Sequence, residues 1–254
     1  MLEFFSELNK RNKLLFWFGF FNIISGFICL GLLISSHQTI LGVNAWSKPL
    51  KYYFSTAITV WSIGWMIYHL HSKSVRAICS FLITIALLAE TSIVTLQSVR
   101  GVPSHFNDSD PFNLMLHSLL LLMILMFSLV MIYVTISLFM QKKMPISQHY
   151  TWGIRLGMLV FVVFTLAGGY MYRIMKHTVG GEDGGAGLPF VNWSTQFGDL
   201  RVAHFLAVHA LQVIPLVSYY FLEKKRQVIR FSILYSILII VLYVLALMKI
   251  PLVP

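Results

Sequence analysis

The chain has 254 residues, of which 57% are hydrophobic and only 11% are charged. This composition excludes an ordinary soluble domain, because about a quarter of the residues in such domains are charged. The formal net charge is +10, but the cations gather at the ends of apolar segments. The basic balance therefore indicates membrane topology, and no nucleic-acid partner is expected.

Seven apolar stretches are long enough to span a bilayer, which takes about 20 residues for each helix. We expect these spans at residues 14–36, 52–70, 76–98, 112–140, 151–175, 200–222 and 228–250. They leave no room for a soluble domain. The sequence therefore predicts an all-α, polytopic membrane bundle, a single transmembrane domain over residues 1–254 with the lipid bilayer as its main partner.

The basic residues also predict the orientation of this bundle. Twelve of the 19 lysines and arginines lie on the side of the N-terminus and of every second connection, and seven lie on the other side. The positive-inside rule then places the N-terminus in the cytoplasm and the C-terminus outside. The expected location is the plasma membrane, the inner membrane of a bacterium.

The second span begins with Lys48-Pro-Leu-Lys51, followed by two tyrosines. Lysine and tyrosine at this position are typical of anchoring at the membrane interface. Together with other cations of the outer side, the two lysines would also make the outer mouth positive. An anionic substrate or a lipid headgroup is the partner that such a mouth would attract.

The third span contains Glu90 and, seven residues later on the same helical face, Gln97. Glu90 lies about ten residues from the outer end, so at about 1.5 Å per residue it should be near the bilayer midplane. A carboxyl at this depth is costly when charged and marks a functional site. Arg100 and His105 follow at the outer end, and we expect them to contact substrate together with Gln97.

The fourth and fifth spans contribute fewer polar groups. His117 lies one to two turns into the fourth span from outside. Gly153 and Gly157 form a small-xxx-small pair in the fifth span, which favours close helix packing. The glycine-rich connection from Lys176 to Gln196 could be a lid at the interface or a flexible linker.

The sixth span has one polar face. With about 100° per residue, the side chains of Arg201, His204, His209 and Gln212 fall within an arc of about 140°. Asp199 precedes them and could simply cap the helix, whose N-terminus favours an acid. A cation such as Arg201 is electrostatically unfavourable at the helix N-terminus, which carries a positive partial charge. This indicates that Arg201 has an acidic partner or ligand.

Three functions are compatible with these groups. The first is a membrane-embedded enzyme or redox protein with an outward-facing site. In it His117 and His204 bind a b-type haem or a zinc ion, and the catalytic residues are Glu90, His209, Arg201 and Asp199. Glu90 and His209, at similar depth, would share a proton or form an ion pair. Gln212 would join the substrate contacts. The second is a proton-coupled transporter or channel with Glu90 as its protonation site. The third is a lipid-binding or assembly subunit without catalysis.

Three segments resemble a family of bacterial multi-pass membrane proteins. They are Trp46–Lys51, Arg100–Asn107 and the stretch from Trp193 to Gln212. The resemblance implies the membrane fold and no particular activity. Standard motifs are missing from the sequence: there is no HExxH, no Gly-x-Ser-x-Gly, and no lysine in the middle of the last span to hold retinal.

Overall fold

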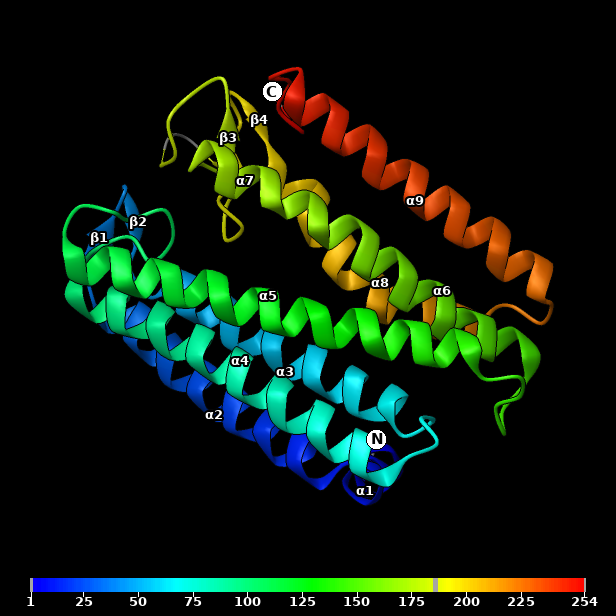
Figure 1. The fold of residues 1–254 in the computed structure, drawn as a ribbon. Coiled ribbons are helices and arrows are strands. Elements are labelled where there is room, and N and C mark those ends of the chain that lie inside the picture. Colours follow the sequence, from blue (N-terminus) through cyan, green and yellow to red (C-terminus); the bar gives the residue numbers. More distant parts are fainter. Residues whose placement is uncertain (1, 185–186, 254) are drawn as a thin grey trace. The chain divides into compact units, whose positions relative to one another are not determined.

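The computed structural model describes residues 2–184 and 187–253. The chain forms two compact units, one ending at Ser137 and the other starting at Leu138 (Figure 1). Almost all regular structure in both is helical, as the sequence predicts.

The first unit contains α1 (Leu2–Arg11), α2 (Lys13–Ser35), α3 (Ser47–Ile67), α4 (Lys73–Arg100) and most of α5 (Pro111–Met140). A short antiparallel pair, β1 (Thr39–Ile40) with β2 (Val43–Asn44), joins α2 to α3. Side chains set the helix ends: Asn12 accepts a hydrogen bond from the backbone N–H of Leu15 at the start of α2, a usual N-terminal cap.

The second unit contains α6 (Gln148–Thr165), the 3-10 turn η1 (Leu166–Gly168), α7 (Gly169–Ile174), α8 (Leu200–Tyr220) and α9 (Lys225–Leu247). The strands β3 (Thr178–Val179) and β4 (Gly198–Asp199) pair antiparallel and bring the loop between them back to the start of α8. The expected span 151–175 is thus interrupted by a 3-10 turn, which the sequence analysis did not predict.

Within the part of the chain that the structure describes, six helices are long and apolar enough to cross a membrane, as expected of an integral multi-pass protein: α2, α4, α5, α6 continued through α7, α8 and α9. The stretch predicted at 52–70 is the helix α3, but it is not among them. Its start is occupied by lysines, tyrosines, serine and threonine, which lower its mean hydropathy. Seven spans are therefore not confirmed, and the orientation of the termini stays a prediction.

Close packing of α6 against α8 is the main contact of the second unit, and the predicted role of the small-residue pair is confirmed. A methyl group on Gly157 would lie 2.8 Å from Cδ of Pro215 and 3.1 Å from the carbonyl oxygen of Ala210, and one on Gly153 would collide with Ser218. Pro215 thus fills the space beside Gly157, where no side chain is present, and the helix α8 continues beyond Pro215.

Arg155, on α6, is buried and closes the end of α5. Its Nε donates to the carbonyl oxygen of Leu138 at 2.9 Å, and Nη2 donates to that of Gln141 at 2.5 Å. These carbonyls lie at a helix C-terminus, where intrahelical donors are missing and a cation is favoured.

We expect Gly157→Ala to lower the free energy of unfolding by about 1–3 kcal/mol, because the added methyl overpacks the contact with Pro215. Gly31→Ala is the matched control, since a methyl group there meets nothing within 4 Å. Thermal unfolding in detergent measures both. Equal stability of the two variants would contradict the close packing of α6 on α8.

Candidate functional site

In the first unit, a polar network gathers where α3 begins and α4 ends. The Nζ of Lys48 lies 3.3 Å from Nδ1 of His105, and the hydroxyl of Tyr52 lies 3.4 Å from Nε2 of the same ring. We call these three residues, Lys48, Tyr52 and His105, the Lys48 network. Glu90 belongs to the same unit and lies on α4, ten residues before its end at Arg100.

This arrangement differs from the interfacial role expected of Lys48. The helix α3 starts with Lys48 in its first turn, so the long side chain can reach from the helix end to groups further inside the unit. A carboxyl within a membrane helix needs a partner of opposite charge or a proton. The expected partner His209 lies in the second unit, and that pairing stays a prediction.

Gln97 and Arg100 are hydrogen-bonded to one another and to Asn113, a residue that helical spacing did not single out. Nη1 of Arg100 donates to Oε1 of Gln97 and to Oδ1 of Asn113, both at 2.6 Å, while Nε2 of Gln97 donates to Oδ1 of Asn113 at 2.8 Å. The amide of Asn113 in turn donates to Oδ2 of Asp110 at 2.5 Å. Asn113 and Gln97 are buried, so the amides hold the guanidinium in one orientation.

His117 supports the loop between α4 and α5. Its Nδ1 accepts a hydrogen bond from the backbone N–H of Phe106 at 3.3 Å. Phe106 has φ = 56°, a left-handed conformation that is unfavourable for a residue with a side chain. The contact with His117 therefore helps to hold a strained loop residue in place.

The hydrogen bonding of His117 fits poorly with the predicted haem or zinc site. A histidine that binds a metal through one ring nitrogen usually donates a proton from the other. Because a backbone N–H can only donate, Nδ1 of His117 must accept, and it cannot carry that proton. We derive no reaction step through a metal at this residue.

In the second unit, Asp199 and Arg201 form the acidic-basic pair that the sequence suggested. Nε and Nη2 of Arg201 donate to the Asp199 carboxylate, at distances down to 2.6 Å. Asp199 also caps α8 by accepting from the backbone N–H of Arg201, and accepts from that of Ser194. Nη2 of Arg201 reaches the carbonyl oxygen of Asn192. These bonds attach the 187–199 loop to α8, so a catalytic role for either residue stays a prediction.

A second ionic group of this unit was missed. Nδ1 of His177 lies 2.7 Å from Oδ2 of Asp183, and Asp183 also accepts from the backbone N–H groups of His177 and Thr178 and from the Thr178 hydroxyl. Burial by itself raises the pKa of the Asp183 carboxyl. The hydrogen bonds and charge of His177, together with Thr178, nevertheless hold this pKa well below its usual range. Helical spacing does not single out these loop residues; Asp183, six positions after His177, was the available signal.

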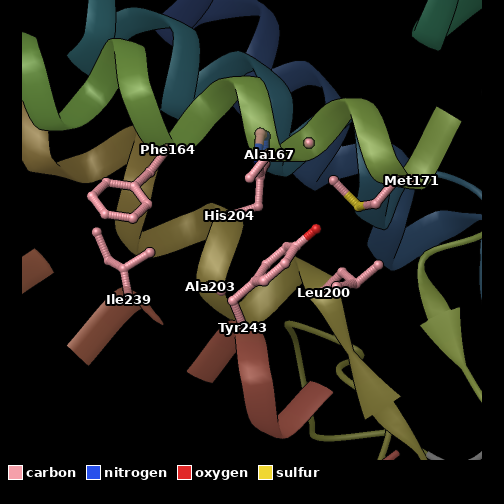
Figure 2. Close-up of a pocket in the computed structure, with 9 residues that line it drawn as sticks. Phe164, Ala167, Met171, Leu200, Ala203, His204, Ile239 and Tyr243 are labelled. Carbon is pink, nitrogen blue, oxygen red and sulfur yellow. The ribbon is translucent and has the colours of Figure 1, made fainter. Parts of the chain in front are cut away.

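His204 lies one turn into α8 and faces the 3-10 turn η1, beside a small pocket (Figure 2). Its ring packs so closely on Gly168 that a methyl group there would lie 2.9 Å from Cε1. Further along the same helix, His209 stacks on Phe205 with ring centroids 4.3 Å apart and lies beside Gln212.

The predicted residues therefore form separate groups. Glu90, His105, Gln97, Arg100 and His117 belong to the first unit, whereas Asp199, Arg201, His204, His209 and Gln212 belong to the second. The predicted pairs Glu90–His209 and His117–His204 each take one residue from each unit and stay predictions. Among the described residues, no three His, Cys, Asp or Glu side chains are placed to hold one metal ion.

Comparison with known proteins adds no relative: no family model, no curated protein and no solved structure matches this chain. The resemblance to a bacterial membrane family thus stays a prediction, and function must be argued from the chain's own geometry.

The Asp183 carboxylate should stabilise its loop in a pH-dependent way. A carboxyl whose pKa is lower in the folded than in the unfolded state stabilises the fold above its unfolded pKa, about 4 for aspartate. That contribution is lost as the pH falls through the lower, folded pKa. We expect Asp183→Asn to cost about 2 kcal/mol at pH 7 and progressively less below about pH 4.

Unfolding temperatures of the two proteins across this pH range measure the effect. Asp108→Asn, at an exposed loop position, is the control and should follow the unchanged protein. A stability difference for Asp183→Asn that stays constant down to the lowest pH would contradict the ionic role of this carboxylate.

Proposed function

We propose that the protein is a proton-coupled membrane transporter in which Glu90 is the protonation site. The observation that carries this proposal is a carboxyl within the membrane helix α4, Glu90, in the same unit as Lys48, which contacts His105 on the loop after α4. Carboxyls in membrane helices that face a polar partner commonly form proton relays in pumps and transporters.

The Lys48 network has the groups that a proton route needs. Imidazole exchanges protons near neutral pH and is a common proton shuttle, and His105 contacts both Lys48 and the Tyr52 hydroxyl. Glu90 and Lys48 can share a proton or separate as an ion pair. Protonation of Glu90 leaves the lysine charge uncompensated, so one proton changes the charge balance of the unit.

The coupled substrate is proposed to be a small anion. Three cationic side chains lie near the start of α3 and the end of α4: Lys48, Lys51 and Arg100. Lining a polar region with charges of one sign raises the local concentration of the opposite ion. One proton and one monovalent anion carried together add no net charge, which lowers the cost of moving both through an apolar medium.

Proton flux in proteoliposomes tests the proposal. With an imposed pH gradient and either chloride or phosphate as the only anion, we expect an internal pH dye to report flux that Glu90→Gln lowers by at least about tenfold, equivalent to about 1.4 kcal/mol in a rate-limiting step. The amide keeps the shape of the carboxyl and removes its titration. Glu182→Gln, at an exposed side chain, should leave the flux unchanged.

The Lys48→Met variant distinguishes a protonation role of Glu90 from a purely structural role of its carboxyl. If Lys48 controls the proton on Glu90, the variant should shift the pH at which flux is half-maximal and retain folded protein. Flux in Glu90→Gln equal to that of the unchanged protein would overturn the proposal.

A further inference from the structure

The end of the second unit where α8 turns into α9 carries exposed cations that the proposed proton route does not use. Five of them come from the connection between α5 and α6 and from the end of the α8–α9 connection with the first two turns of α9: Lys142, Lys143, Lys224, Arg226 and Arg230. We call these five residues the basic cluster. The stretches that contain them, residues 141–150 and 219–230, have one carboxylate, that of Glu223.

Contacts between helix ends bring these stretches to the same end of the unit. The ring of Trp152, on α6, lies 6.3 Å from the ring of Phe139 near the end of α5, measured between centroids. Nζ of Lys225, at the start of α9, lies 3.9 Å from the centroid of the Trp152 ring. The hydroxyl of Ser218, near the end of α8, donates to the carbonyl oxygen of His149 at 3.0 Å. The ends of four helices therefore meet here, and both connections leave from this end.

The basic cluster has no acidic partner within the protein. At the opposite end of the same unit, Lys176 pairs with Glu182 and Arg201 pairs with Asp199. In the part of the chain that the structure describes, no residue of the basic cluster forms an ion pair. Cations gathered at one place repel one another, and an anion from outside the chain lowers that repulsion.

The position of the basic cluster fits the headgroup level of a bilayer. Both α8 and α9 are long and apolar enough to cross a membrane, so the turn between them is expected at a membrane surface. Directly before this turn, the side chains of Tyr219, Tyr220 and Phe221 are well exposed. Exposed aromatic rings beside cations are typical of the membrane interface. The rings offer apolar contact to acyl chains, while an arginine can donate two parallel hydrogen bonds to a phosphate.

We propose that the basic cluster binds anionic phospholipids of the surrounding bilayer. The ligand is a phosphodiester headgroup with a net negative charge, as in phosphatidylglycerol, and its acyl chains lie against the exposed aromatic rings. Phosphatidylcholine carries the same phosphate with a compensating ammonium group, which the cations repel. Each lysine or arginine near an anionic lipid surface strengthens binding about fivefold. This site does not rest on the proton route, because none of its residues belongs to the first unit.

Lipid binding to the full-length protein in detergent, measured by native mass spectrometry, tests the site. Phosphatidylglycerol and phosphatidylcholine with identical acyl chains are titrated separately. We expect phosphatidylglycerol to bind at least about tenfold more tightly. A higher salt concentration should reduce this preference, because salt screens exposed charges. Equal affinity for the two lipids would overturn the proposal.

A triple variant, Lys224→Gln with Arg226→Gln and Arg230→Gln, locates the site. It should lower the preference for phosphatidylglycerol at least about fivefold, and its unfolding temperature checks that it is folded. The matched control removes the same charge from three exposed positions of the first unit: Lys10→Gln, Lys13→Gln and Lys73→Gln. This control should keep the preference. The proposal is overturned if the folded triple variant keeps the preference, or if both variants lose it equally.

Inorganic phosphate distinguishes a lipid from a soluble anion at the same cations. It supplies the charge but has no acyl chain to contact the aromatic rings. We therefore expect that inorganic phosphate at the concentration of the lipid leaves phosphatidylglycerol bound. Displacement of the lipid at equal concentration would mean that the basic cluster binds a soluble anion, and it would overturn the lipid assignment.

Discussion

Polar groups within long apolar helices must find partners inside the protein, because lipid supplies none. The structure meets this constraint by local networks at the helix ends. Arg155 donates hydrogen bonds to the last carbonyls of α5. Arg201 donates to Asp199 and to a loop carbonyl, and Lys48 contacts His105. Two of these three cations have structural partners on backbone carbonyls; Lys48 instead contacts groups that exchange protons. We therefore assign Arg155 and Arg201 a structural role and treat the surroundings of Lys48 as the candidate site.

Hydropathy and spacing predicted much of the fold. Long apolar segments became α2, α4, α5, α8 and α9 within a few residues of the expected limits, since length and apolar composition alone determine whether a helix can cross a bilayer. The break at Leu166–Gly168 was not predictable in this way. It coincides with the close approach of His204 from another helix to Gly168, and a contact distant in sequence leaves no local signal.

The candidate site was predicted only in part. Gln97 and Arg100 are three residues apart on one helix, and their side chains are hydrogen-bonded, but their expected contact with substrate stays a prediction. The role of Lys48 was not foreseen, because a lysine at the start of a span looks the same whether it extends to the interface or into the protein. Asp183 and Asn113 were missed for a similar reason: their partners come from turns and loops, where spacing does not define a common face.

The central claim is that Glu90 changes its protonation state in response to the pH at the His105 end of the first unit. Infrared difference spectroscopy of the protein in lipid nanodiscs, between acidic and alkaline buffer, tests it most directly. The account predicts a protonated-carboxyl band that disappears in alkaline buffer, is absent from Glu90→Gln and titrates at a shifted pH in Lys48→Met. A difference spectrum identical in the unchanged protein and Glu90→Gln would contradict it.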